Sequence, residues 1–399
     1  MNFFSLPPSG NPIPISHIFR ATSVFFRNTQ GEDGFQEIIK TYLKVKHCLL
    51  VSSGTAALWL ILKAAKKIEQ KRNEVIIPAY TCPSVAAAVI RAGLKPILCD
   101  INMQDFGFEL EALKKKINFK TLAIIIVHLF GFPSNIRKVK QISRSSNILL
   151  IEDAAQALGN SMINSPQEKL GSLGDIGFYS FGRGKPLTLN HGGLIVTNNS
   201  QLFEQIFQIY QTIERPSLTE NFLLLAKLYF YVFFFHPSLY WIPQSIPFLK
   251  LGKTIFDLNF KIKKTSPIGV ALANKSIGLI EENKKVRQKN TTFLLQRLNS
   301  FKKINLPAYP FPYLRFPLIV SSNTHRNRLL AHLRAQGLGA TMFYPCPLNE
   351  QPGLKEYLHD TNIYPNAKKL SQTLITLPLH QEVSHKDLNT MVDIITHYL

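Results

Sequence analysis

The chain has 399 residues, of which 45% are hydrophobic and 18% are charged. This length and composition exclude a disordered protein and predict one large domain with a smaller one. The 46 lysines and arginines against 25 acidic residues give a net charge of +21, which favours acidic partners. The basic residues are scattered, and no zinc-finger or RRM pattern accompanies them, so the sequence argues against nucleic acid as a partner.

The four cysteines stand far apart and form no CxxC pair; they are Cys48, Cys82, Cys99 and Cys346. This spacing predicts neither a disulfide framework nor a metal site, and it is typical of a reducing compartment. Residues 1–8 lack the basic start and the apolar run of a signal peptide, so we expect a cytoplasmic protein.

From about residue 48 to residue 200, short apolar runs alternate with stretches of helical spacing. The runs that predict buried strands are 75–77, 96–99, 123–127, 148–151, 176–179 and 194–196. The stretches that predict helices are 56–67, 84–91, 135–144 and 201–213. This alternation predicts an α/β fold in which a mostly parallel sheet is flanked by helices. Its functional loops are expected at the carboxyl ends of the strands.

We divide the chain into a large α/β domain with an N-terminal arm over 1–213, an insertion over 214–265, and a C-terminal part over 266–399. The C-terminal part is predicted to hold a long helix over 268–296, with Arg287 on its polar face, and a smaller α+β domain. That domain is expected to contain a strand over 314–320 and helices over 326–336 and 387–398.

The insertion carries eight consecutive apolar residues, 228–235, and a basic stretch with Lys250, Lys253, Lys261, Lys263 and Lys264. The apolar run is shorter than the roughly 20 residues that a membrane-spanning helix needs. Two interpretations stay open. The segment is a peripheral element on an anionic membrane surface, or it packs against the body or a second subunit.

The apolar run 148–151 ends in Glu152 and Asp153, and Lys185 follows 32 residues after Asp153 in a glycine-rich loop. A strand-end carboxylate, a loop lysine and a glycine pair at 192–193 are what a pyridoxal phosphate (PLP) enzyme needs. The lysine binds the cofactor aldehyde covalently, and the carboxylate keeps the pyridine nitrogen protonated so that the ring accepts electrons.

Small and hydroxyl residues at 52–58 precede a predicted helix. The backbone N–H groups at such a helix start suit a phosphate dianion. An ordinary N-cap by Ser53 or Thr55 is the alternative. Farther along the chain, Gln156 could face the cofactor ring, and Ser180 could add a hydroxyl to the phosphate site.

Together these motifs resemble the DegT/DnrJ/StrS family of PLP-dependent sugar aminotransferases, which has the aspartate aminotransferase-like fold (PLP fold type I). The similar segments are 53–58, 78–81, 127–131, 152–156, 180–185, 192–193, 344–348 and 377–380. The resemblance implies these roles: covalent PLP binding for Lys185, the pyridine nitrogen for Asp153, the ring for Gln156, and the phosphate for Gly54, Thr55 and Ser180. A lysine at position 185 also argues against the family's dehydratase branch, in which histidine takes that place.

The sequence departs from the family at positions near the substrate. Cys82 stands where many relatives carry an aromatic that stacks on the ring, so either Cys82 or Tyr80 could cover it. Asn349 replaces a histidine, and the Asn-x-Arg element that reaches the partner subunit's site is poorly matched around 262–264. The cofactor half of the site therefore matches the family, while the substrate half is changed.

The resemblance implies an aminotransferase that moves an amino group from an amino acid, glutamate by analogy, to a nucleotide- or lipid-linked keto sugar. Such an enzyme would serve polysaccharide or glycoconjugate biosynthesis and would act as a homodimer. The alternative from another class is a protein with this fold and a lost or changed activity that serves a binding or regulatory role.

Overall fold

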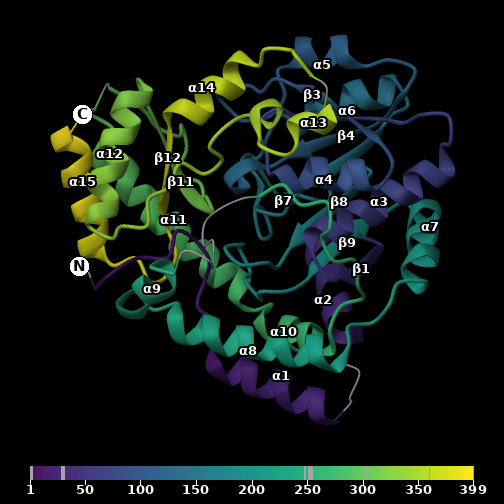
Figure 1. Ribbon diagram of the computed structural model, residues 1–399, viewed down its shortest axis with the longest axis horizontal. Coiled ribbons are helices and arrows are strands. Elements are labelled where there is room, and N and C mark those ends of the chain that lie inside the picture. Colours follow the sequence, from purple (N-terminus) through teal and green to yellow (C-terminus); the bar gives the residue numbers. More distant parts are fainter. Residues whose placement is uncertain are drawn as a thin grey trace.

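The computed structural model describes residues 3–27, 32–246, 249, 255–301, 303–358 and 360–398. A seven-stranded sheet forms the centre of the large part of the molecule, at the right of Figure 1. A three-stranded sheet with its helices forms the C-terminal part at the left. The division of the chain at residues 213 and 265 stays a prediction.

The large sheet is mixed, with one antiparallel strand among parallel ones. Its order is β1 (His47–Val51), β9 (Gly193–Thr197), β8 (Ile176–Ser180), β5 (Leu149–Asp153), β4 (Thr121–Val127), β2 (Glu74–Pro78) and β3 (Lys95–Cys99). β9 runs antiparallel to both of its neighbours, and the remaining pairs are parallel. Every residue of β4 is buried, as expected for the middle of a sheet covered on both faces. The predicted fold class is confirmed.

Helices connect and cover these strands, and their starts are set by local sequence. They are α2 (Glu32–Leu43), α3 (Gly54–Ile68), α4 (Pro83–Arg91), α5 (Leu110–Lys116), α6 (Ile136–Ser145) and α7 (Ser200–Gln211). Ser53 caps α3 by accepting a hydrogen bond from the Ala56 amide at 3.1 Å. A short hairpin, β6 (Ser161–Met162) and β7 (Ser165–Lys169), lies between β5 and β8 in the chain. Because the parallel strands share one direction, the segments that follow β1, β2, β4, β5 and β8 meet at one edge of the sheet.

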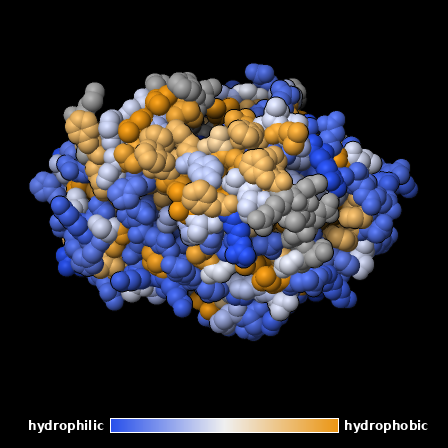
Figure 2. All heavy atoms as spheres, turned by 90° about the horizontal axis from the view of Figure 1, so that it is seen from below, coloured by the Kyte–Doolittle hydropathy of each residue, from blue (hydrophilic) through white to orange (hydrophobic). Residues whose placement is uncertain are grey.

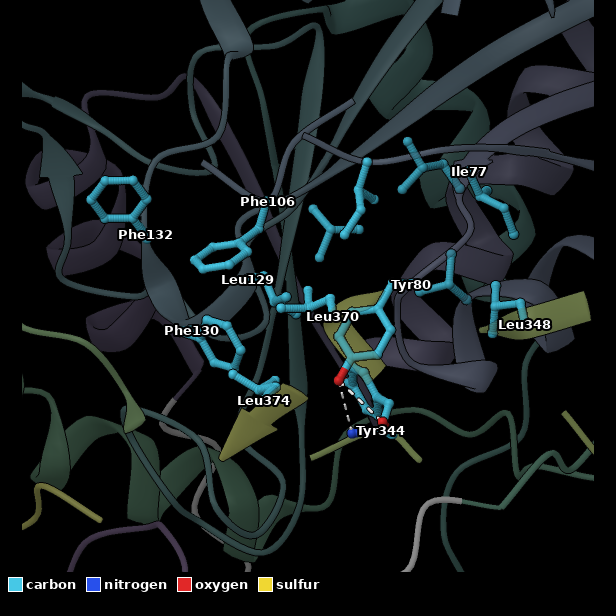
Figure 3. Close-up of a cluster of buried hydrophobic side chains, with 14 of the residues drawn as sticks. Ile77, Tyr80, Phe106, Leu129, Phe130, Phe132, Tyr344, Leu348, Leu370 and Leu374 are labelled. Atoms are coloured by element: carbon cyan, nitrogen blue, oxygen red, sulfur yellow. Dashed lines mark hydrogen bonds between the residues drawn. The ribbon is translucent and has the colours of Figure 1, made fainter. Parts of the chain in front are cut away.

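The C-terminal part packs three antiparallel strands against helices. The strands are β10 (Ile304–Asn305), β11 (Arg315–Val320) and β12 (Leu374–Pro378), and the helices are α11 (Leu279–Leu298), α12 (Asn323–Ala335), α13 (Lys355–Leu358), α14 (Pro365–Thr373) and α15 (His385–Tyr398). The two parts share one apolar cluster (Figure 3). Within it, the Tyr80 hydroxyl donates to the Tyr344 carbonyl at 3.1 Å and accepts from the Tyr344 amide at 3.3 Å.

The predicted long helix over 268–296 is wrong in one respect, because it is two helices. α10 (Pro267–Ser276) ends before Ile277 and Gly278, and α11 begins at Leu279. Glycine has low helix propensity, which favours an interruption of the helix at Gly278. The placement of Arg287 on a polar face is also wrong, since its side chain is buried on α11. Burial lowers the pKa of Arg287 to about 10.

The apolar insertion forms α8 (Leu218–Phe234) and α9 (Pro237–Gln244) at the bottom of Figure 1. One side of α8 is buried against α1 (Ile15–Arg27) and α10 through Leu224, Leu225 and Leu228. Another side stays exposed, and the large apolar side chains exposed on α1 and α8 are Ile15, Phe19, Phe26, Leu218, Phe222, Leu223, Phe230 and Phe233. Apolar side chains gather on this face when it is seen from below (Figure 2). No helix in the described part of the chain is both long and apolar enough to cross a membrane.

The basic stretch after α9 is largely engaged within the chain. Lys261 and Lys263 each form an ion pair at 2.7 Å, with Glu220 and Glu214 respectively. The Lys264 ammonium donates to the Gln211 carbonyl at 3.0 Å. Lys250 and Lys253 lie outside the described residues.

Candidate active site

The start of α3, the end of β8 and the glycine pair form one closely packed unit. A Cβ placed on Gly54 would lie 2.9 Å from the Ser180 Cβ, and one placed on Gly193 would lie 2.4 Å from the Ser53 carbonyl carbon. The Gly192 amide donates to the Ser52 carbonyl at 2.9 Å. Thr55 lies half-buried in the first turn of α3. The structure therefore gathers the three residues proposed for the phosphate at one helix N-terminus.

The same unit is tied to the segment where the family's Asn-x-Arg element is expected. The Lys263 amide donates to the Ser52 hydroxyl at 3.2 Å, and Lys264 forms an antiparallel bridge with Val51. The 262–264 segment thus lies beside the residues that precede α3 in its own chain.

Asp153 ends β5 as a buried carboxylate with few partners. It accepts a hydrogen bond from the Ala155 amide at 3.0 Å. Burial raises the pKa of Asp153, while the Ala155 amide and the positive charge of Lys185 act in the opposite direction. A buried carboxylate near a lysine is suited to a cationic ring nitrogen.

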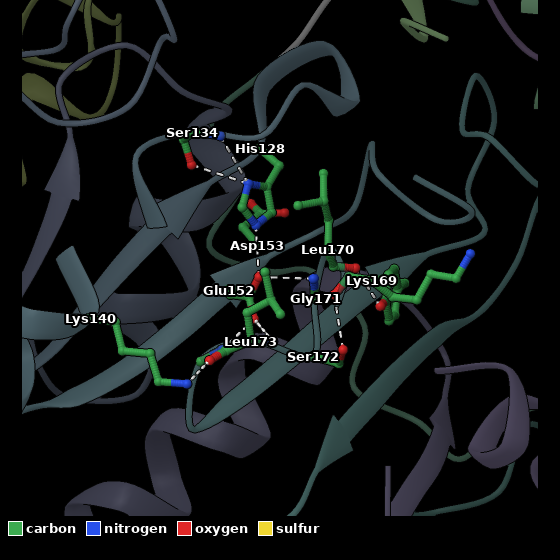
Figure 4. Close-up of polar contacts among 12 residues, drawn as sticks. His128, Ser134, Lys140, Glu152, Asp153, Lys169, Leu170, Gly171, Ser172 and Leu173 are labelled. Carbon is green, nitrogen blue, oxygen red and sulfur yellow. Dashed lines mark hydrogen bonds and ion pairs between the residues drawn. The ribbon is translucent and has the colours of Figure 1, made fainter. Parts of the chain in front are cut away.

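Glu152, the residue before Asp153, forms a buried hydrogen-bond network that stabilises the fold (Figure 4). The fully buried Glu152 carboxylate accepts the amides of Gly171, Leu173 and Gly174 and pairs with His128 Nε2 at 2.8 Å. The Ser134 amide donates to His128 Nδ1 at 3.4 Å, which leaves the ring proton on Nε2. The Glu152–His128 pair therefore joins the ends of β4 and β5 next to Asp153 in the chain.

Lys185 lies in the loop between β8 and β9, and the N-terminal arm holds this loop. The Asn11 side-chain amide donates to the carbonyls of Lys185 and Pro186, at 3.2 and 2.7 Å. The Ser9 hydroxyl donates to the Gly184 carbonyl at 3.0 Å. The Tyr231 hydroxyl of α8 donates to the Asn11 carbonyl at 2.9 Å, so the arm connects α8 to the lysine loop.

Lys185 opens onto a cavity of about 800 Å³ that Gln156 and Cys82 also line. Gln156 is buried, and its Oε1 accepts a hydrogen bond from the Phe130 amide at 3.0 Å. Of the two candidates for covering a ring, Cys82 lines this cavity, whereas the Tyr80 side chain is buried against Tyr344. The cofactor residues proposed from the sequence thus lie at the cavity or at the adjoining strand ends.

Several cavity residues were not singled out from the sequence. The cations Arg183, Lys227 and Arg315 line the cavity together with Lys185, and none of the described residues that line it is acidic. Arg315 donates to the hydroxyls of Thr341 and Ser9, at 2.9 and 3.0 Å. The feature of the sequence that could have indicated Arg315 is its single charge at the start of the apolar run 314–320. Among the described residues, no group of His, Cys, Asp or Glu is arranged to hold a metal ion.

Comparison with known proteins agrees with this arrangement. Residues 21–396 match the family model of the DegT/DnrJ/EryC1/StrS aminotransferase family. The chain belongs to this aminotransferase family. The family resemblance drawn from the motifs is therefore confirmed.

Individual relatives match over different lengths. A GDP-perosamine synthase of Vibrio cholerae is 31% identical over 177 residues, which are 44% of this chain and 47% of that protein. The chain thus spans about half the length of that relative. A pleiotropic regulatory protein of Geobacillus stearothermophilus is 26% identical over 90% of this chain and 87% of that protein. Among solved structures, Helicobacter pylori PseC, an aminotransferase involved in the biosynthesis of pseudoaminic acid, has a TM-score of 0.78 and 19% identity and covers 99% of both chains.

The residues present fit PLP. Glycine at position 54 lets the Ser180 side chain pack against the start of α3, so a hydroxyl lies beside the free backbone amides that a phosphate site requires. A buried carboxylate and a lysine lie within electrostatic reach of each other. The two observations are independent, because the fit to the phosphate depends on the packing of Gly54, whereas the fit to the ring depends on the charges of Asp153 and Lys185.

Proposed function

We propose that this protein is a PLP-dependent aminotransferase that moves an amino group from an amino acid to a keto sugar linked to a nucleotide or a lipid, in polysaccharide or glycoconjugate biosynthesis. The observation that carries the proposal is the buried Asp153 carboxylate near Lys185, at the edge where β5 and β8 end. Family membership and the cavity beside Lys185 support it.

Each proposed residue has one task. Lys185 would hold the cofactor covalently until the donor's amino group displaces it, and the amine so released would move a proton from the donor's α-carbon. Asp153 holds the proton on the pyridine nitrogen, and Gln156 and Cys82 contact the ring. Gly54, Thr55 and Ser180 bind the phosphate with backbone amides and hydroxyls. When bound, PLP supplies an aromatic ring that accepts electrons from the donor's α-carbon.

Arg315 is the proposed anchor for a carboxylate of the amino-acid donor, glutamate by family analogy. A guanidinium binds a carboxylate through paired charge-assisted hydrogen bonds. Arg315 lines the cavity and has no acidic partner among the described residues. Its Nε atom is buried and forms no hydrogen bond to a described residue, so it is free to donate to a ligand.

The proposed assembly is a homodimer, supported by the exposed apolar side chains Ile15, Phe19 and Phe26 of α1, which a second copy would cover. Peripheral contact with an anionic membrane has less support, since Lys261 and Lys263 already pair with glutamates. Sedimentation velocity measures the oligomeric state, and flotation with anionic liposomes measures membrane binding, so together they distinguish a homodimer from a membrane-bound protein. A dimer that does not float is expected, and a monomer that floats would contradict the assembly.

A second candidate is a binding or regulatory role without turnover. The 26% identity to a protein named a pleiotropic regulatory protein, over 90% of this chain, favours it. Adding glutamate to the PLP-loaded protein tests both candidates. Loss of the visible PLP absorbance, with formation of the keto acid, is expected of an aminotransferase. Unchanged absorbance with glutamate and with every other amino acid would favour the regulatory role.

A further inference from the structure

The cavity beside Lys185 has a second end whose chemistry differs from that of the cofactor end. Helices α8 and α9 form this end with Phe230, Phe234, Phe235, Tyr240 and Pro243. Phe230 and Phe234 stack on each other with ring centroids 4.3 Å apart. The insertion that departs most from the family pattern therefore builds one wall of the reaction cavity.

The spacing of the residues along α8 explains how this helix both packs against the body of the protein and lines the cavity. Leu224, Leu225 and Leu228 pack into the body. Ala226, Phe230 and Phe234, spaced four residues apart, share another face and line the cavity. Phe230 is also 46% exposed, so the apolar wall continues from the cavity to the molecular surface. That surface lies on the apolar face seen in Figure 2.

Positive charge lies between the two ends. Arg183 belongs to the lysine loop, two residues before Lys185, and lines the cavity. Burial raises the pKa of the Tyr231 hydroxyl of α8 and of the Tyr240 hydroxyl of α9, and Arg183 is close enough for its charge to oppose this shift in both. Lys227 adds a second cation from α8, and neither cation forms an ion pair with a described residue. An anionic group would therefore be attracted between the reaction centre and the apolar wall.

The wall is suited to a hydrocarbon and poorly suited to a nucleobase. A base stacks on aromatic rings, but its N–H and C=O groups require hydrogen-bond partners once they are buried. The side chains of Phe230, Phe234, Phe235 and Pro243 provide none, and Tyr240 provides a single hydroxyl where a buried base presents several polar groups. The Tyr231 hydroxyl already donates to the Asn11 carbonyl. A hydrocarbon chain needs no such partner and is stabilised by burial alone.

We propose that the acceptor end binds a keto sugar carried on a lipid phosphate, with the phosphate at Arg183 and Lys227 and the hydrocarbon chain along Phe230 and Phe234. This inference names the acceptor class and rests on the proposed aminotransferase function. Through the Tyr231–Asn11–Lys185 hydrogen bonds, the wall also contacts the segment that holds the lysine loop.

Calorimetric titration tests the inference. The full-length, PLP-loaded protein is titrated with three ligands: n-decyl phosphate below its micelle concentration, n-butyl phosphate and uridine diphosphate. Decyl phosphate is expected to bind at least tenfold more tightly than butyl phosphate, because each buried methylene contributes a factor on the order of three. Its heat-capacity change should also be more negative. Uridine diphosphate is expected to bind no more tightly than inorganic diphosphate.

Matched variants locate the effect. Phe230→Ala and Phe234→Ala are expected to weaken decyl phosphate about tenfold and to leave butyl phosphate unchanged, since only the apolar contact is removed. Arg183→Gln should weaken both alkyl phosphates. Phe119→Ala is the control, because Phe119 is 83% exposed and lies two residues before the amino end of β4, at the opposite edge of the sheet.

Three results would overturn the inference. The first is an equal affinity for decyl phosphate and butyl phosphate. The second is binding of uridine diphosphate that depends on Phe230. The third is dissociation of the dimer in Phe230→Ala, with the affinity for every ligand reduced by the same factor. The glutamate-driven absorbance change is measured on the same samples. If it persists while the chain-length effect is absent, only the lipid acceptor is refuted. If neither glutamate nor any other amino acid produces the absorbance change while the chain-length effect persists, the aminotransferase proposal is refuted instead.

Discussion

The Nε2 atom of His128 lies 2.8 Å from Oε2 of Glu152, and both side chains are fully buried. The pair joins β4 to β5, and the same carboxylate accepts the amides of the loop at 171–174. The His128 amide in turn donates to the Asp153 carbonyl at 3.1 Å. The position of Asp153 therefore depends on a buried network that does not itself contact substrate.

Glu152→Gln should destabilise the fold. A glutamine amide presents N–H groups where Glu152 accepts amide protons, and buried donors without acceptors are costly. We expect a loss on the order of 2–4 kcal/mol in the free energy of unfolding, measured by urea denaturation. Glu168→Gln is the control, because Glu168 pairs with Arg137 at the surface. Equal stability of both variants would contradict the structural task of Glu152.

Gly54→Ala should weaken PLP binding. Its methyl group would lie 2.9 Å from the Ser180 Cβ, so either the start of α3 or Ser180 must move away. We expect the apparent Kd for PLP, measured by absorbance titration, to rise about tenfold or more, since phosphate contacts depend on sub-ångström placement. Gly278→Ala serves as the control, because no heavy atom lies within 4 Å of its added methyl group. An unchanged Kd in Gly54→Ala would refute the phosphate site.

Arg315→Gln should impair use of the amino donor more than it impairs PLP binding. Charge-assisted hydrogen bonds contribute about 1.5–3 kcal/mol each, so KM for the donor should rise roughly ten- to hundredfold. Single-turnover kinetics at increasing donor concentration give this value. Arg328→Gln on the exposed face of α12 controls for loss of a positive charge. A donor KM that stays at the wild-type value would assign the carboxylate to another residue.

His380 should make stability depend on pH below neutrality. Its Nε2 lies 2.7 Å from the Pro7 carbonyl, and burial lowers its pKa to about 4 from an ordinary value of 6.5. Between these values the unfolded chain binds more protons at this residue, so the free energy of unfolding falls as the pH falls from 6.5 to 4. The slope from one such group is at most about 1.4 kcal/mol per pH unit.

Urea denaturation between pH 4.5 and pH 7 measures this slope. His380→Gln retains a donor for the Pro7 carbonyl but cannot be protonated, so its slope should be smaller than that of the wild type. His397→Gln, at an exposed position near the end of α15, should keep the wild-type slope. A His380→Gln slope equal to that of the wild type would contradict the buried neutral histidine.

The sequence alone was sufficient for those parts of the site that local motifs encode. The strands that end at Asp153 and Ser180 are apolar runs with clear ends, and a parallel sheet brings such ends together. Strand β1 was not predicted, because its place depends on pairing with β9, far along the chain. Arg287 was misplaced because α11 buries polar residues such as Asn283 and Asn290 as well as apolar ones, so the apolar pattern does not mark its buried side.

The substrate half could not be predicted for a physical reason. Helix α8 is apolar on several sides, so its periodicity does not indicate which side packs inward and which side lines a cavity. Arg315 reaches the cavity from the C-terminal sheet, and Asn11 reaches the lysine loop from the N-terminal arm. Such contacts between distant segments depend on tertiary packing.

Borohydride reduction of the PLP-loaded protein, followed by peptide mass spectrometry, tests the central claim most directly. The reduced cofactor should be attached at Lys185, should disappear in Lys185→Ala, and should remain in Lys227→Ala, which removes the other lysine that lines the cavity. Attachment at Lys227 or elsewhere, or no attachment at all, would contradict the assignment of Lys185.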